Sequence, residues 1–405
     1  MRICFLTDNF PPENNAPASR TYDHCLRWAQ HGHEITVITC FPNFPTGKVF
    51  PGYTNGLYLK ERIKNITVIR VWSYMAPNSG FFKRTLDYIS FALSSFCVGL
   101  FEEFDAIVAT SPQFFVAIAA RKLAFFKRKP WIMEVRDLWP SSIVEVGAMR
   151  KGVALKYLEW QEKICYLKAK HIVCVTNSFA KEINNKGIKA NKLSVIPNGV
   201  DLIKFVPREK CDRLLNELGL KNKFIVGFIG THGMAHGLDF IIKTTCSVNN
   251  SQIHFLFIGE GSEKLSLQKL AEDLGCANVT FLDAVSKNII EKYLNLIDVA
   301  LIPLRDKPIF ETVIPSKIFE SAAMQKPILL GVRGEAKILL EKYNAGLTYQ
   351  PEDEHDFLRQ LKVLFENKVL YKEFQKGCYE LSQNYNRDKL ANEMLNIITN
   401  VNRRN

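Results

Sequence analysis

The sequence predicts an α/β protein with two doubly wound parallel-sheet domains that face each other across a cleft. The first observation is the alternation of short, β-rich apolar runs with helix-length segments along the whole chain, a pattern typical of parallel sheets with crossover helices. The second is the length of 405 residues, which is long for a single domain. The third is a Pro-Asn-Gly turn at 197–199, after which the pattern restarts.

The expected elements follow the chain in order. A helix is expected from about Pro17 to Gln30, and the turn at 197–199 predicts domains over 1–200 and 201–385. Strands are predicted in the first half at Arg2–Thr7, Ile35–Cys40, Thr67–Val71, Ala106–Ala109, Trp131–Val135 and His171–Val175. In the second half they are predicted at Phe224–Ile229, His254–Ile258, Val279–Leu282, Val299–Ile302 and Pro327–Leu330.

Charge and cysteine usage narrow the class of protein. The net charge of +12 lies almost wholly in residues 1–200, which hold 26 Lys and Arg against 15 Asp and Glu. This excess predicts an anionic partner: nucleic acid, an acidic bilayer or a phosphorylated acceptor. Nucleic acid is disfavoured because no nucleic-acid-binding motif accompanies the charge. The ten cysteines are scattered without a CxxC pair, and no signal peptide opens the chain, so a reduced, cytosolic protein is expected.

Two segments favour contact with a membrane surface. In 81–101, only the 14 residues from Tyr88 to Phe101 are free of charge, too few for a spanning helix. The segment Phe114–Lys129 places four phenylalanines around clustered lysines and arginines, which suits a helix lying on an anionic membrane. The alternative is that both segments are packing helices with solvated ends.

The segment Pro315–Ala323 is the strongest candidate for ligand binding. Lys317 and Ser316 stand at the start of an expected helix, where free N–H groups and a partial positive charge attract phosphate. Glu320, one turn further on, can accept hydrogen bonds from the two hydroxyls of a ribose. These residues together predict a nucleotide site, and the alternative is a helix start with solvated Lys and Glu side chains.

Three glycine-containing loops follow predicted strands in the second half. The loop Gly230–Gly237 could bring backbone N–H groups close to a diphosphate. The loop Gly259-Glu260-Gly261 begins like a dinucleotide fingerprint but lacks its third glycine and the later acidic residue, which disfavours a nicotinamide enzyme. The pattern of the loop 331–334 is also that of an ordinary strand-to-helix turn.

Taken together, these motifs resemble the family-4 retaining glycosyltransferases, whose GT-B architecture joins two Rossmann-like domains. The resemblance rests on 197–201, the 230–237 loop, Gly259–Gly261, 278–282, 298–304, Pro315–Glu320 and 326–329. Asp8–Glu13 and Pro130–Pro140 resemble a branch that acts in surface polysaccharide and O-antigen assembly, including transfer of N-acetyl-fucosamine-type sugars. The resemblance to this family implies metal-independent catalysis without a cofactor. It also implies a C-terminal helix, about 386–405, that crosses back to the first domain.

The resemblance implies a donor site in the second domain for a nucleotide sugar, expected to be a UDP-sugar. Glu320 matches the ribose-binding carboxylate, Ser316 and Lys317 match the residues at the donor phosphates, and Gly230, Thr231, Gly233 and His236 belong to the matching glycine loop. Thr231 and His236 stand where many relatives have arginine and lysine. Eight residues separate Glu311 from Glu320, where the usual pattern has seven, so backbone N–H groups at 312–314 are an alternative to Glu311 as the sugar ligand.

In the first domain the resemblance implies the acceptor side of the site. Asn14 and Asn15 match the turn near donor and acceptor, and Arg136 and Asp137 end the strand that carries a sugar-facing histidine in many relatives. A helix-capping ion pair is the alternative for Arg136 and Asp137. Asn43 lies in an aromatic, proline-rich loop expected to fold over the cleft or to pack onto its domain.

The predicted reaction is retaining sugar transfer to a polyprenyl-diphosphate-linked saccharide by an enzyme on the inner face of the membrane. Because a dianion departs from an oxocarbenium-like sugar, charge stabilisation by Lys317 should be the largest catalytic effect. His236 or Arg136 would assist Lys317 with the leaving-group charge. Asp137 would orient the acceptor or steady the positive charge on the sugar. Two other functions remain open: a nucleotide-sugar 2-epimerase and a non-catalytic nucleotide-binding scaffold. The cluster 353–356 is interpreted as helix-capping carboxylates rather than a metal site.

Overall fold

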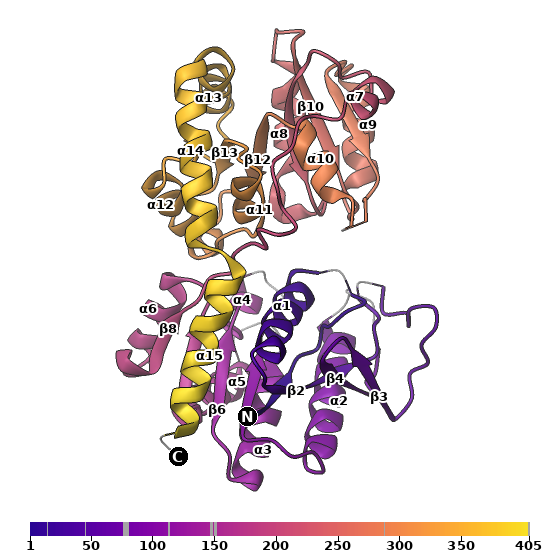
Figure 1. The fold of residues 1–405 in the computed structure, drawn as a ribbon. Coiled ribbons are helices and arrows are strands. Elements are labelled where there is room, and N and C mark those ends of the chain that lie inside the picture. The colour runs from indigo at the N-terminus through magenta and orange to yellow at the C-terminus, as the bar shows by residue number, and fades with distance from the viewer. Residues whose placement is uncertain are drawn as a thin grey trace. The chain divides into compact units, whose positions relative to one another are not determined.

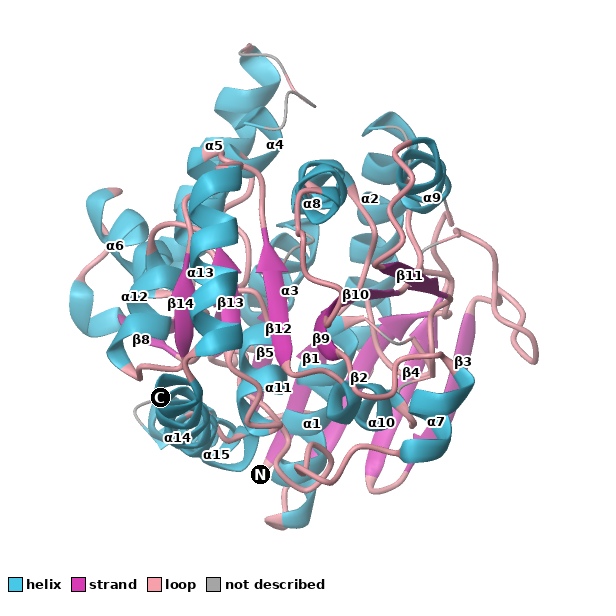
Figure 2. Ribbon diagram, turned by 90° about the horizontal axis from the view of Figure 1, so that it is seen from above, coloured by secondary structure: helices cyan, strands magenta, loops and turns pink. Residues whose placement is uncertain are grey.

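The computed structural model describes residues 1–13, 15–44, 46–75, 81–111, 114–145, 149, 152–286 and 288–403. The chain forms two compact units, here called unit 1 (Met1–Pro197 with Arg387–Asn405) and unit 2 (Asn198–Asn386). Each unit is a largely parallel β-sheet with helices on both faces (Figures 1 and 2). The predicted fold class of two parallel-sheet α/β domains is therefore confirmed.

Unit 1 is built on an eight-stranded sheet in the order β3-β4-β2-β1-β5-β6-β7-β8. All neighbours are parallel except the edge pair β3 and β4, which is antiparallel. The central strands are almost fully buried apolar runs, as expected of a sheet covered on both faces. The strands are β1 (Arg2–Leu6), β2 (Glu34–Cys40), β3 (Tyr58–Ile63), β4 (Ile66–Val71), β5 (Ala106–Thr110), β6 (Trp131–Val135), β7 (His171–Cys174) and β8 (Leu193–Val195).

The helices of unit 1 form two layers. Helices α1 (Ala16–Gln30) and α15 (Arg387–Arg403) pack together on one face of the sheet, with Trp28 and Met394 in their shared core. Helices α2 (Phe81–Gly99), α3 (Phe114–Lys127) and α5 (Val153–Lys168) lie on the opposite face, α3 between the other two. The shorter helices are α4 (Ser141–Glu145) and α6 (Asn177–Asn185). Within the described residues, no helix combines the length and the apolar character that crossing a membrane requires.

Unit 2 has a six-stranded parallel sheet in the order β11-β10-β9-β12-β13-β14. One apolar layer packs beneath α8, α9 and α13, and the other beneath α10, α11, α12 and α14. Its strands are β9 (Phe224–Ile229), β10 (Ile253–Ile258), β11 (Val279–Leu282), β12 (Val299–Pro303), β13 (Ile328–Gly331) and β14 (Gly346–Thr348). Its helices are α7 (Asp212–Glu217), α8 (Leu238–Cys246), α9 (Lys264–Asp273), α10 (Ile290–Leu296), α11 (Lys317–Ala323), α12 (Glu335–Lys342), α13 (Glu354–Glu366) and α14 (Lys368–Asn384).

The structure corrects one expectation about the cysteines. Cys246 at the end of α8 and Cys276 before β11 form a disulfide, so the prediction that all cysteines are reduced is wrong for this pair. They are 30 residues apart in sequence, and only the packing of α8 against α9 brings their Cα atoms to 5.3 Å. Sequence spacing alone carries no sign of that approach.

Candidate functional site

The carboxyl edge of the unit 2 sheet is shaped by two loops that touch each other. A Cβ atom added at Gly259 would overlap the carbonyl oxygen of Gly230, and one added at Gly261 would overlap the carbonyl of His232. The N–H of His232 donates to the carbonyl of Glu260 at 2.9 Å. Glycine at 259 and 261 is thus required for the loop after β10 to pack under the loop after β9. The role of the Gly259-Glu260-Gly261 motif is therefore to let these two loops pack closely.

Lys317 occupies the space that the missing side chain of Gly230 leaves open. A Cβ on Gly230, whose φ is +149°, would lie 2.6 Å from the Lys317 Nζ atom. That Nζ atom lies 3.7 Å from the centre of the Phe228 ring, is shielded from solvent and has no hydrogen-bond partner among the described residues. Burial lowers the pKa of Lys317 to about 7, with Glu320 opposing the shift. An ammonium in this position lacks an anion, although Phe228 stabilises it by a cation–π contact.

Two histidines lie beside Lys317. The ring of His232 is buried against Phe228, Phe257 and Phe281, and both of its nitrogens lack partners in the described structure. Burial, then the charges of Lys264 and Lys317, lower the pKa of His232 to about 4. Burial and Lys317 lower the pKa of His236 to about 3, while its Nδ1 lies 3.2 Å from the Pro303 carbonyl. Both rings are therefore neutral near pH 7, so neither histidine adds to the positive charge that Lys317 carries when it is protonated.

The other residues predicted to bind the nucleotide-sugar donor differ in how far they are exposed to solvent. Glu320 is partly buried and lines a small cavity of about 20 Å³ together with Lys317. Ser316 is the N-cap residue of α11, but its side chain makes no capping bond. Thr231 is exposed, and a Cβ on Gly233 would meet only the Thr231 methyl group at an ordinary 3.7 Å. Helix α11 has seven residues and begins at Lys317.

Glu311 lies in the 3₁₀ turn Pro308–Thr312, with an exposed side chain. A Cβ on Gly334, at φ +67°, would overlap the Glu311 carbonyl, so this position in the loop after β13 cannot carry a side chain. The third glycine loop is thus the strand-to-helix turn between β13 and α12. Its glycine positions the 308–312 turn.

Arg305 was not identified from the sequence, yet it braces the 230–237 loop. It follows β12, and its Nε donates to the Met234 carbonyl at 2.8 Å. Its guanidinium also binds Asp239 at 2.7 Å and Glu352 at 3.1 Å. Because these carboxylates already neutralise Arg305, it holds the loop in shape rather than replacing the missing loop cations. In the sequence, Arg305 is one more charged residue in a loop after Ile302-Pro303, and no motif there predicts that it braces the 230–237 loop.

The predicted residues of unit 1 lie where β6 ends. The N–H groups of Arg136 and Asp137 donate to the hydroxyl of Ser111 at 2.8 and 3.3 Å. The Asp137 carboxylate accepts from the Ser142 hydroxyl at 2.9 Å, and burial raises its pKa. Burial lowers the pKa of Arg136 to about 10 despite the nearby charge of Glu134. Both residues are partly exposed at the carboxyl edge of the sheet.

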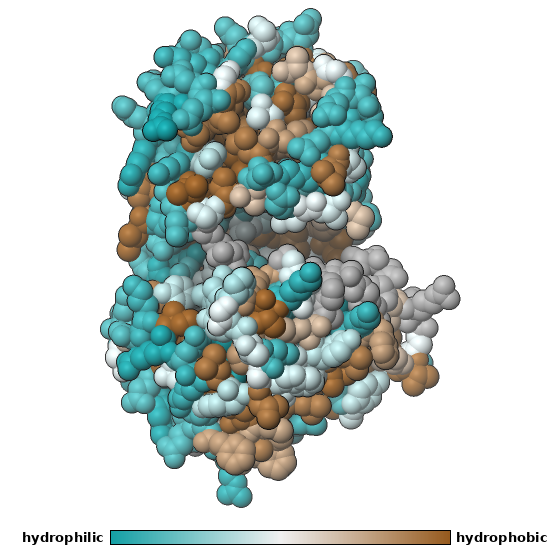
Figure 3. Space-filling view, turned by 90° about the vertical axis from the view of Figure 1, so that its right-hand side faces the viewer, coloured by the Kyte–Doolittle hydropathy of each residue, from teal (hydrophilic) through white to brown (hydrophobic). Residues whose placement is uncertain are grey.

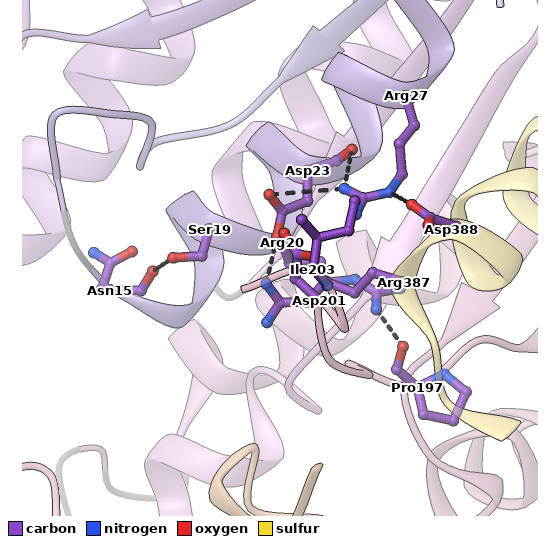
Figure 4. Close-up of polar contacts among 10 residues, drawn as sticks. All are labelled: Asn15, Ser19, Arg20, Asp23, Arg27, Pro197, Asp201, Ile203, Arg387 and Asp388. Atoms are coloured by element: carbon purple, nitrogen blue, oxygen red, sulfur yellow. Dashed lines mark hydrogen bonds and ion pairs between the residues drawn. The ribbon is translucent and has the colours of Figure 1, made fainter. Parts of the chain in front are cut away.

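The asparagines expected at the acceptor have structural partners. Asn15 is the N-cap of α1, where its Oδ1 accepts the Ala18 N–H at 2.9 Å and its carbonyl accepts the Ser19 hydroxyl (Figure 4). Asn43 is buried, and its amide donates to the Phe41 carbonyl at 2.9 Å. Its backbone N–H is held by the carboxylate of Glu13. Asn14 lies outside the described residues.

A network of buried ion pairs sits behind these residues and was missed by the sequence reasoning. Arg20 on α1 donates from Nε to Glu134 at 2.9 Å, and each side chain is only 1% exposed. Arg20 also donates to the carbonyls of Ile196 and Pro197. The start of α15 is attached to α1 by the pairs Arg387–Asp23 and Arg27–Asp388 (Figure 4).

Metal binding gains no support from the cluster at 353–356. Asp353 is the N-cap of α13 and accepts the Asp356 N–H at 2.9 Å, which confirms its predicted capping role. Within the described residues, no three His, Cys, Asp or Glu side chains are grouped closely enough to hold a metal ion.

Two adjoining family models match the chain. One, Glycosyltransferase Family 4, matches residues 18–204, and the other, Glycosyl transferases group 1, matches residues 223–367. Both models describe glycosyltransferases, so the chain is a glycosyltransferase whose residues 18–204 match family 4. The first of these models spans most of unit 1 and the second most of unit 2.

Individual relatives are consistent with this family. The chain is 26% identical over 352 residues to the colanic acid biosynthesis glycosyl transferase WcaI of Escherichia coli, covering 85% of this chain and 84% of WcaI. It is 26% identical over 248 residues to the alpha-galactosylglucosyldiacylglycerol synthase of Streptococcus pneumoniae, covering 59% and 62%. Its fold matches that of Anabaena HepE, solved with UDP and glucose, with a TM-score of 0.73 at 15% identity over 99% of this chain and 100% of HepE.

Proposed function

We propose that this glycosyltransferase moves a sugar, with retention of anomeric configuration, from a UDP-sugar to a lipid-linked saccharide during assembly of a surface polysaccharide. The sugar we propose is of the N-acetyl-L-fucosamine type, and the acceptor a polyprenyl-diphosphate-linked saccharide at the inner face of the membrane. The named role of WcaI in colanic acid biosynthesis and the lipid product in the name of the streptococcal relative support the acceptor class. The UDP in the HepE structure supports the donor class.

The observation that carries the proposal is the state of Lys317. Its ammonium group is shielded from water, has no hydrogen-bond partner among the described residues, and lies against the bare backbone of Gly230. Burying a cation without an anion is costly, and its low pKa is a sign of that cost. A diphosphate beside Gly230 would supply the missing anion, and Glu320 would accept hydrogen bonds from its ribose. Ser316, Thr231, Gly233 and His236 would complete the donor site, with Glu311 or the N–H groups of 312–314 at the sugar.

The proposed mechanism depends on charge placed beforehand at the leaving group. As the sugar–phosphate bond breaks, negative charge accumulates on the departing diphosphate and positive charge on the sugar ring. Lys317 stabilises the first, and it costs little reorganisation because its side chain is already held over Phe228. The departing phosphate oxygen takes the proton of the attacking hydroxyl, so the reaction needs no separate strong base. His236 or Arg136 assists Lys317 at the leaving group. Asp137 orients the acceptor, and Asn14, Asn15 and Asn43 complete the acceptor side. This chemistry uses no metal ion and no resident cofactor.

The test is to supply radiolabelled nucleotide sugars together with a membrane lipid extract. Label moving into the lipid fraction with retained configuration supports the proposal. Conversion of one nucleotide sugar into another, without transfer to lipid, would instead identify a 2-epimerase, and binding without turnover would identify a scaffold.

The variant Lys317→Ala tests the role of the cation. We expect turnover to fall by about a hundredfold to a thousandfold, the usual cost of removing one donor to a developing anion. Circular dichroism should show an unchanged fold. A variant that keeps near-normal turnover would remove Lys317 from the mechanism.

A further inference from the structure

The two helical layers of unit 1 differ sharply in what they expose to solvent. The layer of α2, α3 and α5 exposes ten large apolar side chains, whereas α1, α6 and α15 expose none among the described residues. Figure 3 shows one side of unit 1, on which apolar side chains lie among polar ones. The ten residues are Phe82, Leu86, Ile89, Leu93, Phe125, Phe126, Val153, Tyr157, Trp160 and Leu167.

On α5 the exposed apolar residues are interleaved with lysines. Val153, Tyr157, Trp160 and Leu167 follow helical spacing along one side and are 86%, 55%, 55% and 53% exposed. Lys156, Lys163 and Lys168 are exposed on the same helix, which exposes a single carboxylate, Glu159. The other carboxylate of α5, Glu162, is buried and bound to Lys186 at 2.8 Å. The outer side of α5 is therefore both apolar and cationic.

The cationic character continues into a pocket at the end of α3. The pocket has a volume of about 510 Å³, and no carboxylate lines it. Its lining residues are Arg121, Lys122, Ala124, Phe125, Phe126, Lys129, Pro130, Trp131, Lys168 and Lys170. Arg121 is fixed by a bond to Gln161 at 2.9 Å, and the Gln161 amide donates to the Tyr157 hydroxyl at 3.1 Å. These bonds join the pocket and the outer side of α5 into one surface.

The chemistry of this surface selects one occupant. Tryptophan and tyrosine beside lysines suit the headgroup level of a bilayer, and clustered cations attract anionic phospholipids. The aliphatic Val153, Leu93 and Leu167 would not stack on nucleic-acid bases, but they can enter the acyl boundary. Five cations around Phe125 and Phe126 match a lipid phosphate with its adjoining acyl chain.

We propose that the α2–α3–α5 layer is the membrane-docking face of the protein, and that the pocket at the end of α3 holds the phosphate of an anionic phospholipid. This inference rests on the proposed function for its purpose, because a lipid-linked acceptor is reached from the membrane. It goes further by assigning the contact to named side chains, including α5, which the sequence did not single out.

The experiment is sedimentation of the full chain with sucrose-loaded vesicles, without donor. Anionic vesicles of phosphatidylcholine with about 30% phosphatidylglycerol are compared with neutral vesicles of phosphatidylcholine alone. The charge variant is Lys156→Glu, Lys163→Glu and Lys168→Glu together, and its matched control is Lys181→Glu, Lys189→Glu and Lys389→Glu, three exposed lysines outside this layer. The apolar variant is Leu93→Ser, Tyr157→Ser and Trp160→Ser, matched to Leu57→Ser with Trp72→Ser.

We expect the wild type to bind anionic vesicles at least tenfold more tightly than neutral ones. The charge and apolar variants should each lose at least tenfold, and the matched controls less than twofold. Equal binding by variant and control would overturn the inference. So would a wild-type dimer in solution that the apolar variant dissociates, because the layer would then be an interface between copies.

Donor binding is measured separately by calorimetry with UDP in vesicle-free solution. If UDP binds and vesicles do not, the docking face is wrong, while the donor site of the proposed function is supported. If vesicles bind and UDP does not, the proposed function fails while the docking face stands.

Discussion

Buried charges are handled in opposite ways in the two units. In unit 1, Arg20 and Glu134 are both almost fully buried and are bonded to each other. In unit 2, the Lys317 Nζ atom is also shielded from solvent but has no hydrogen-bond partner among the described residues. It lies over the Phe228 ring, and the charge of Glu320 only partly opposes the fall of its pKa. The three residues lie on elements of different kinds, Arg20 in α1, Glu134 in β6 and Lys317 at the start of α11.

The difference separates charges that hold the fold from a charge that awaits a ligand. Burial alone would raise the pKa of Glu134, but Arg20 and Arg136 lower it below its ordinary value. The pKa of Lys317 instead moves against its charged state. A paired charge is therefore favoured by its surroundings, and an unpaired one is tolerated at a cost that a bound anion can repay.

The largest expected effect comes from breaking the pair in unit 1. Glu134→Ala leaves Arg20 buried and uncompensated, so the free energy of unfolding should fall by about 3–5 kcal/mol. Denaturant unfolding measures this, and UDP binding at low temperature should stay within twofold of wild type. The double variant Arg20→Met, Glu134→Leu removes both charges and should recover much of the loss. If the single variant is as stable as wild type, the pair does not hold the fold.

The next effect is the pH dependence of donor binding in unit 2. Because Lys317 has a pKa of about 7, the ammonium is present below pH 7 and is lost as pH rises. A bound diphosphate raises that pKa, so UDP affinity should fall by up to about tenfold per pH unit above pH 7, until the bound pKa is reached. His232 and His236 are neutral throughout this range. Calorimetry between pH 7 and 9 measures the slope, and Lys317→Met should flatten it. A steep slope that persists in Lys317→Met would assign the titration to another group.

A smaller effect concerns stability without ligand. Because folding lowers the pKa of Lys317, its charge destabilises the folded state below pH 7, and this penalty disappears as pH rises toward the unfolded value. Lys317→Met should therefore raise Tm at pH 7 by roughly 2–4 °C, corresponding to about 1 kcal/mol, with a smaller gain at pH 10. Thermal unfolding at the two pH values measures the difference.

Lys326 provides the matched control for that experiment. It is a buried lysine of the same unit, with a pKa lowered to about 8, but its ammonium donates to the Asn295 carbonyl at 3.0 Å. Lys326→Met removes this bond and should not raise Tm. Equal gains from the two variants would show that Lys317 is no more strained than an ordinary buried lysine.

The fold could be predicted from the sequence because its signals are local. The predicted strand Phe224–Ile229 coincides with β9 residue for residue, since a buried parallel strand is a continuous apolar run. Strand β3 was missed because Tyr58–Ile63 carries three charges and lies exposed at an antiparallel edge. Strand β14 has only three residues, and such a run gives no pattern.

The arrangement of the site could be predicted only in part. Lys317, Glu320 and the 230–237 loop were selected by their chemistry, but their roles stay predictions. The ring of Phe228 under Lys317 and the burial of His232 depend on how strands and loops pack. The same holds for the Arg20–Glu134 pair, whose members are 114 residues apart. Contacts of this kind join residues that are far apart in the sequence, so the spacing of neighbouring residues does not predict them.

The smallest effect tests whether Asn15 belongs with the structural or the ligand-binding groups of unit 1. As the N-cap of α1 it accepts the Ala18 N–H, so Asn15→Ala should cost about 1 kcal/mol of stability, measured by denaturant unfolding. Asn15→Ser keeps a capping oxygen and should restore most of that loss. If Asn15 also meets the acceptor, Asn15→Ser should raise the acceptor KM at least fivefold while stability stays near wild type. An unchanged KM in this variant leaves Asn15 as a helix cap alone, and the acceptor side must then be built from other residues of the same edge, beginning with Asp137.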